Sequence, residues 1–164
     1  MPSYSKARWE SIVERFYEKY AGLKEWQEEN ISTVYKTGGI LKNPTGREFV
    51  FRITNGGYDI RQIKNYPVQS FATADIMPLA MCIIYKQYRA LELKSRIIAQ
   101  VHDSLIFDVP KEELRTIAKL CTRVFERLPH YIKELWGFEF NVSLGGEIEY
   151  GPNYGQLTEY KEIN

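Results

Sequence analysis

The chain has 164 residues, which is enough for one domain with a buried apolar core. Its 22 lysine and arginine residues balance 21 aspartate and glutamate residues, so the formal charge of +1 excludes a globally basic nucleic-acid-binding protein. Any contact with DNA must therefore come from a local basic patch.

The cysteines and the apolar runs exclude further classes. Cys82 and Cys121 are too few and too far apart in sequence for a zinc site or a redox pair, so we expect both to be reduced, buried thiols. No stretch approaches the roughly 18 apolar residues that span a membrane, and the N-terminus lacks an apolar run after its basic residues. We expect a cytoplasmic protein, in the host cell if it is viral, with no membrane partner.

Periodicity predicts two helices and a hairpin in the first third of the chain. The first helix ends near residues 21–22, and a second helix follows and ends at Gly38 and Gly39. Residues 40–43 and 48–53 then pair as a hairpin. The apolar stripe of the first helix contains Trp9, Ile12, Val13, Phe16, Tyr17 and Tyr20.

The rest of the chain alternates between helices and strands. A brief helix is predicted over residues 59–64, and a long, mostly apolar helix from Pro67 through residue 91. Strands are predicted at residues 95–101, 105–109 and 138–148, with an amphipathic helix that follows Pro110 and is broken at Pro129. The fold class is α+β, an antiparallel sheet with long helices packed mainly on one face.

The first two of these strands enclose a tight turn that contains an acidic side chain. The turn is His102-Asp103-Ser104, and the strand edges hold its backbone on both sides. A carboxylate aimed in this way is suited to bind a catalytic metal ion. The alternative is that Asp103 and Ser104 simply form the turn through side-chain hydrogen bonds to their own backbone.

Three segments of the sequence favour the interpretation of Asp103 as a metal ligand. They are residues 65–76, which begin Asn-Tyr-Pro-Val-Gln and run into residues 78–81; residues 100–105, Gln-Val-His-Asp-Ser-Leu; and residues 146–155, Gly-Glu-Ile-Glu-Tyr-Gly-Pro-Asn-Tyr-Gly. Together they resemble family A DNA polymerases, a family that includes bacterial DNA polymerase I and several phage replicative enzymes. In that family, an Asn-x-Pro-x-Gln segment opens a long palm helix, a Val-His-Asp-Glu hairpin is motif C, and a Gly-x-Asn-Trp-like segment lies near the C-terminus.

Weaker similarities extend the resemblance towards the N-terminus. Residues 16–26 are similar to a Phe-x-x-Tyr-Pro-Gly run that joins two helices behind the fingers, and residues 39–47 resemble a hairpin with Gly-Arg-Arg at its tip. The similarity covers about residues 15–154. It implies a single domain over residues 1–164 that is the C-terminal half of a polymerase palm, with residual fingers-proximal helices in about residues 1–38.

The resemblance implies a role for the turn in catalysis by two Mg²⁺ ions. Asp103 matches the motif C aspartate, which binds these ions together with an aspartate from motif A. His102 matches a residue that touches the primer terminus, although a turn histidine satisfied by backbone is an equal alternative. Ser104 departs from the family pattern, which usually has Glu there, and this departure puts a second carboxylate role in doubt.

The resemblance also implies contacts with primer-template DNA. Arg61, Asn65 and Gln69 match positions that contact template and primer, and Arg47 belongs to a local basic group around the first hairpin. The first three are spaced by four residues and share one side of a helix if it is continuous through Pro67. The structural alternatives are a helix cap for Asn65, an exposed helix residue for Gln69 and a solvated surface for the arginines.

Two motifs of the family are not found in this sequence. Motif A supplies the other metal-bridging aspartate, and motif B grips the incoming dNTP. We therefore expect part of a DNA-directed DNA polymerase, an expressed fragment or one product of a split gene, that needs both motifs from a missing segment or a second polypeptide. Self-association of the chain is a further expectation. The alternative is a non-catalytic palm-fold module that binds DNA or a partner.

Overall fold

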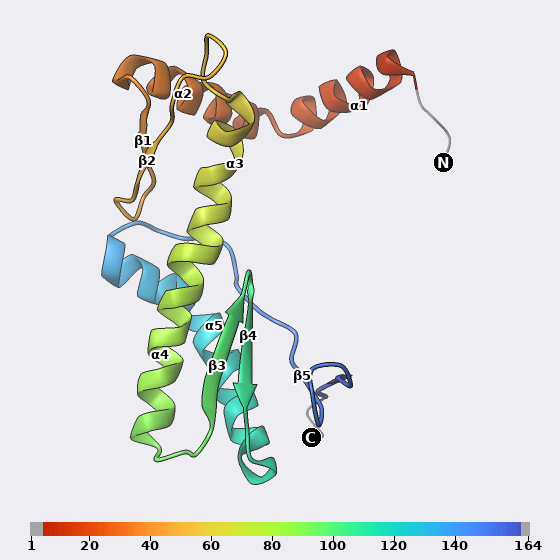
Figure 1. The fold of residues 1–164 in the computed structure, drawn as a ribbon, viewed down its shortest axis with the longest axis vertical. Helices are drawn as coiled ribbons and strands as arrows, with labels where there is room; N and C mark the ends of the chain where they lie inside the picture. The colour runs from red at the N-terminus through yellow and green to blue at the C-terminus, as the bar shows by residue number, and fades with distance from the viewer. Residues whose placement is uncertain (1–4, 162–164) are drawn as a thin grey trace. The chain divides into compact units, whose positions relative to one another are not determined.

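The computed structural model describes residues 5–161, which divide into two compact units (Figure 1). One unit ends at Ser70 and the other begins at Phe71. The sequence-based prediction of a single domain over the whole chain stays a prediction.

The first unit begins with two helices, as predicted. Helix α1 spans Lys6–Lys19 and α2 spans Ala21–Thr37, which ends at Gly38 in the left-handed conformation (φ +72°) that glycine adopts without strain. The apolar stripe of α1 is not a core face, because no residue of α1 is buried and Trp9 is 54% exposed. The helical period was therefore informative about conformation but not about burial.

A short hairpin and a third helix complete this unit. Strands β1 (Ile40–Lys42) and β2 (Glu48–Val50) pair antiparallel, and α3 spans Ile60–Ser70. The small core joins α2, the hairpin and α3. Its buried members are Val34, Leu41, Phe51 and Ile63.

Helix α3 runs through Pro67, contrary to the expectation of a brief helix followed by a new helix that starts at this proline. Ile63 and Pro67 lie one turn apart and both are buried on the same face. Burial of this face therefore outweighs the backbone hydrogen bond that proline cannot donate.

The second unit begins with a π-helical turn, η1 (Phe71–Ile76), followed by α4 (Met77–Ala90). Strands β3 (Arg96–Val101) and β4 (Ser104–Asp108) form the predicted hairpin. A short 3₁₀ turn, η2 (Lys111–Glu113), leads into the long helix α5 (Leu114–Trp136). Figure 1 shows β3 and β4 alongside α4 and α5. Buried residues of η1, α4 and α5 make up the core: Ile76, Ala80, Ile84, Tyr88, Ile117, Leu120, Val124, Leu128 and Ile132.

Helix α5 is not broken at Pro129, which was the prediction. It continues to Trp136 and ends at Gly137 in a left-handed conformation (φ +75°). Leu128 and Ile132 are fully buried on either side of the proline. Burying two such side chains contributes about 3 to 6 kcal/mol, which offsets the roughly 3 kcal/mol cost of an internal proline.

The predicted strand over residues 138–148 is wrong, because this segment has no regular structure. Its side chains Phe138, Phe140 and Leu144 pack against the helical core, so its apolar pattern reflects packing without strand pairing. Pairing is confined to β5 (Glu149–Tyr150) and β6 (Thr158–Glu159). The described chain has three two-stranded antiparallel sheets among long helices, which confirms the α+β class.

One of the two cysteines predicted to be buried is exposed. Cys82 is exposed, contrary to the prediction, whereas Cys121 is partly buried and its burial raises the pKa of its thiol to about 12.

Within the described residues, the helical run Ile60–Ala90 is long and apolar enough to cross a membrane by length and composition. Core helices of soluble proteins meet the same criteria, so this is weak evidence for a membrane span.

Candidate active site

Hairpin β3–β4 packs against the core along its strands and is exposed at its turn. Ile97, Leu105 and Phe107 pack against the core of the second unit. The pairing runs from Arg96 opposite Asp108 to the last ladder pair, Val101 opposite Ser104. His102 and Asp103 form the two-residue turn between the strands, and both are exposed. The predicted placement of Asp103 on a tight turn between two strands is therefore confirmed.

The turn conformation is set by a residue with a positive φ angle and by a side-chain bond. His102 has φ +53°, a region that residues with a Cβ atom rarely adopt. The hydroxyl of Ser104 donates to the carbonyl oxygen of Val101 at 2.9 Å. Ser104, which stands where the family has Glu, thus closes the turn. Within residues 5–161, the carboxylate of Asp103 has no hydrogen bond or ion pair and is open to solvent.

Gln100 contributes to the same turn, a role that the sequence pattern did not predict. Its side-chain nitrogen Nε2 donates to the carbonyl oxygen of His102 at 3.1 Å and to that of Thr73 in η1 at 2.8 Å. The only available sequence signal was the position of this amide, two residues before the turn in a strand of apolar residues. Nothing in the strand pattern indicated the contact with η1.

The turn offers a metal ion one hard oxygen ligand, the carboxylate of Asp103. Among the described residues, no three His, Cys, Asp or Glu side chains come together as a group that could bind a metal ion. Mg²⁺ prefers carboxylate oxygens and commonly binds one or two carboxylates together with water and substrate phosphates. Asp103 fits a magnesium site as a single ligand, with the other ligands supplied from elsewhere.

Helix α3 in the first unit places three of the predicted DNA-contacting residues in one row. Arg61, Asn65 and Gln69 are all exposed, on the side away from the buried Ile63 and Pro67. Because the helix is continuous, the row spans about 12 Å, at a rise of about 1.5 Å per residue. The structure therefore brings these three side chains to one surface, as their spacing predicted.

The carboxylate that precedes this helix fixes its first turn. Asp59 Oδ1 accepts from the backbone nitrogen atoms of Arg61 at 2.9 Å and Gln62 at 3.4 Å. It also lies 3.7 Å from the guanidinium of Arg61, whose side chain is 90% exposed. A carboxylate at a helix N-terminus satisfies backbone donors that have no partner within the helix. Asn65 is not a helix cap, since it lies in the middle of α3.

Arg47 lies at the turn of the β1–β2 hairpin and is exposed. The buried side chain of Asn43 organises this turn, because its Oδ1 accepts from the backbone nitrogen of Arg47 at 3.0 Å and from the Thr45 hydroxyl at 2.6 Å. The backbone of Arg47 is thereby fixed.

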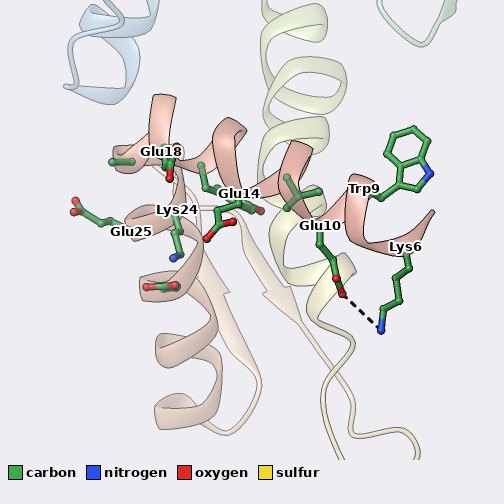
Figure 2. A pocket seen from close by; sticks show the side chains of 11 residues that line it. Lys6, Trp9, Glu10, Glu14, Glu18, Lys24 and Glu25 are labelled. Carbon is green, nitrogen blue, oxygen red and sulfur yellow. Dashed lines mark ion pairs between the residues drawn. The ribbon is translucent and has the colours of Figure 1, made fainter. Parts of the chain in front are cut away.

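A groove between α1 and α2 has a different character (Figure 2). Apolar side chains of α1 form part of its lining, and five glutamates and two lysines surround them, with Lys6 paired to Glu10 at 3.6 Å. An excess of carboxylates repels the phosphates of nucleic acid. None of the predicted site residues lines this groove, so it does not belong to the candidate site.

Comparison with known proteins relates this chain to a family. The model of DNA polymerase family A matches residues 3–156. The DNA polymerase I of Bacillus subtilis (strain 168) is 31% identical over 121 residues, which are 71% of this chain and 14% of that protein. The DNA polymerase of Bacillus phage SP01 is 28% identical over 156 residues, which are 92% of this chain and 17% of that protein.

A solved structure supports the same relationship at the level of the fold. The POL domain of Pol1 from M. smegmatis, in complex with DNA primer-template and dNTP, matches with a TM-score of 0.67 at 23% identity. The match covers 76% of this chain and 23% of that chain. This chain thus spans only a small part of the length of its relatives. The match of the family model over nearly all of the sequence shows that the chain belongs to DNA polymerase family A.

Proposed function

We propose that this chain is the motif C part of a DNA-directed DNA polymerase, in which Asp103 is a metal ligand for template-directed nucleotidyl transfer. The observation that supports this function best is the presentation of Asp103 at the exposed turn of a hairpin whose strands pack against the core. A carboxylate on such a scaffold keeps its direction, as a catalytic metal site requires. The position also matches the motif C aspartate of the family.

The reaction defines what the residues of the turn do. When bound, two Mg²⁺ ions would lower the pKa of the primer hydroxyl and neutralise charge on the leaving pyrophosphate. Asp103 would hold these ions through its carboxylate, and its exposure leaves room for the other ligands. His102 precedes it in the turn and contacts the primer terminus in this assignment. The residue is exposed, as such a contact needs.

The exposed row on α3 is assigned to the DNA duplex. Arg61 pairs with the phosphate backbone, while the amides of Asn65 and Gln69 contact minor-groove acceptors that all base pairs share. Such contacts test the shape of a base pair without selecting a sequence. Arg47 adds a second cationic contact from its fixed hairpin turn. The primer-template and dNTP in the M. smegmatis complex support these substrates for the assembled enzyme.

Motifs A and B supply the remaining metal ligands and the dNTP-binding residues in the proposed enzyme. We assign them to a missing segment or to a second polypeptide. The exposed apolar residues of α1, Trp9, Ile12, Val13 and Phe16, offer a surface for that polypeptide or for a second copy of the chain.

DNA binding by the isolated chain tests the assignment of the α3 row. We expect weak binding to a primer-template duplex, and Arg61→Ala should reduce the slope of log affinity against log salt by about 1 because one phosphate contact is lost. Fluorescence anisotropy at several salt concentrations measures this slope. Arg89→Ala is the matched control, since Arg89 is exposed near the end of α4 and should leave the slope unchanged. Equal slopes for wild type and Arg61→Ala would remove Arg61 from the DNA interface.

One observation favours a second function, that of a non-catalytic palm-fold module that binds DNA or a partner. Ser104 stands where the family usually has Glu. Its hydroxyl donates to the carbonyl oxygen of Val101, so this residue closes the turn and supplies no carboxylate to a metal ion. The module hypothesis predicts DNA binding that is independent of Asp103, and no activity in any assembly. Primer extension by the assembled protein separates the two functions.

A further inference from the structure

The turn that presents Asp103 has a backbone conformation that its own residues do not favour. His102 adopts φ +53°, a left-handed conformation in which the Cβ atom is crowded by the backbone. Such a conformation persists only where neighbouring groups hold it. The carbonyl oxygen of His102 accepts a hydrogen bond from Gln100 Nε2 at 3.1 Å. This carbonyl belongs to the peptide that joins His102 to Asp103, so the bond constrains the peptide from which Asp103 starts.

The second hydrogen bond of Gln100 is accepted by a residue in the π-helical turn η1. Thr73 lies in η1, and its carbonyl oxygen accepts from the same Nε2 atom at 2.8 Å. π-Helical turns are rare, and they occur frequently at functional sites. Here the turn offers a backbone oxygen to a side chain 27 residues away in the sequence.

Strand β3 is irregular just before Gln100, and this irregularity explains how the side chain reaches η1. The pairing register shifts between Ile97 and Ala99. Strict alternation from the half-buried Ile97 would place Gln100 on the exposed face, yet Gln100 is half-buried. A β-bulge adds one residue and re-aims the side chains that follow it, often next to an active site.

We propose that Gln100 is a positioning residue for Asp103, an inference that rests on the function proposed above. Its primary amide has two N–H groups on one nitrogen, so a single atom bridges the carbonyl oxygens of Thr73 and His102. The bridge fixes the hairpin tip to η1, and it holds the carboxylate of Asp103 in the direction that the metal ions need.

Nuclear magnetic resonance of the labelled full chain tests the bridge without DNA or Mg²⁺. We expect scalar couplings across the hydrogen bonds between Gln100 Nε2 and the carbonyl carbons of Thr73 and His102. Gln100→Met keeps the length of the side chain but has no donor, so amide hydrogen exchange at Ser104, in the last ladder pair before the turn, should rise about three- to tenfold. Gln100→Glu, whose ionised carboxylate has the same shape and only accepts, provides a second variant and should behave in the same way.

Gln87→Met is the matched control for these variants. Gln87 lies in α4 of the same unit and is half-buried, and its replacement should leave exchange at the hairpin tip unchanged. Absence of both couplings in the wild-type chain, or wild-type exchange at Ser104 in both Gln100 variants, would overturn the bridge. These readouts are independent of polymerase activity, so they decide on the bridge even if the proposed function fails.

The positioning role is tested in the material that extends primers. Gln100→Met should raise the Mg²⁺ concentration for half-maximal extension by about tenfold, as expected when a group that orients a metal ligand is lost. The maximal rate at saturating Mg²⁺ should stay within about twofold, whereas a merely damaged fold lowers the amount of active enzyme without changing the Mg²⁺ requirement. An unchanged Mg²⁺ requirement would overturn the positioning role, and couplings that persist would then assign the bridge to structure alone.

Discussion

At the scale of single residues, one carboxylate fixes the backbone that immediately precedes strand β3. Glu113 lies at the end of η2, and its carboxylate accepts from the backbone nitrogen of Lys94 at 2.8 Å and from that of Ser95 at 2.9 Å. The fully buried hydroxyl of Ser95 donates to the same carboxylate at 2.6 Å. The Lys94 backbone amide and the Ser95 hydroxyl lower the pKa of Glu113 below its ordinary value of 4.5.

This shift predicts a dependence of stability on pH. Because the folded-state pKa of Glu113 is lowered, its stabilising contribution is present above pH 4.5 and is lost as the pH falls through the folded-state pKa. Glu113→Gln should therefore lower the urea midpoint at pH 7, and the difference from wild type should shrink at about pH 3. Glu112→Gln is the control, since the neighbouring Glu112 is exposed and should change neither midpoint. A difference that is the same at both pH values would rule out this role of the ionised carboxylate.

At the scale of elements, the proline positions show how tertiary packing overrides local preference. Pro67 and Pro129 both stand inside helices, although a proline usually ends or kinks a helix. In both cases a buried face continues across the proline: Ile63 precedes Pro67, and Leu128 and Ile132 flank Pro129. The sequence pattern contains this apolar face, but a local rule that ends a helix at proline takes no account of the burial that opposes it.

Truncation of a residue beyond Pro129 tests the continuity of α5. Ile132→Ala should lower the free energy of unfolding by about 2 to 5 kcal/mol, because the residue is fully buried and its loss leaves a cavity. Leu135→Ala, on the same helix at 59% exposure, should change it by about 0.5 kcal/mol or less. Urea denaturation measures both values. A small effect of Ile132→Ala would mean that α5 does not pack beyond the proline.

At the scale of the whole molecule, local features were predictable from the sequence and tertiary ones were not. The turn with Asp103 and the row of Arg61, Asn65 and Gln69 follow from strand alternation and from a spacing of four residues. The bridge from Gln100 to η1 depends on a β-bulge and a π-helical turn, and neither has a periodic signature. The apolar segment 138–148 packs without pairing, a distinction that alternation alone does not make.

The central claim is that Asp103 is a metal ligand of a DNA polymerase. The measurement is Mg²⁺-dependent primer extension by material co-purified with the tagged chain from its native source, with wild type beside Asp103→Asn. Asp108→Asn is the matched control, because Asp108 is an exposed aspartate at the opposite end of the same hairpin. We expect Asp103→Asn to reduce extension at least about a hundredfold and Asp108→Asn to leave it unchanged. Extension that persists in Asp103→Asn would contradict the assignment of Asp103 as the metal ligand.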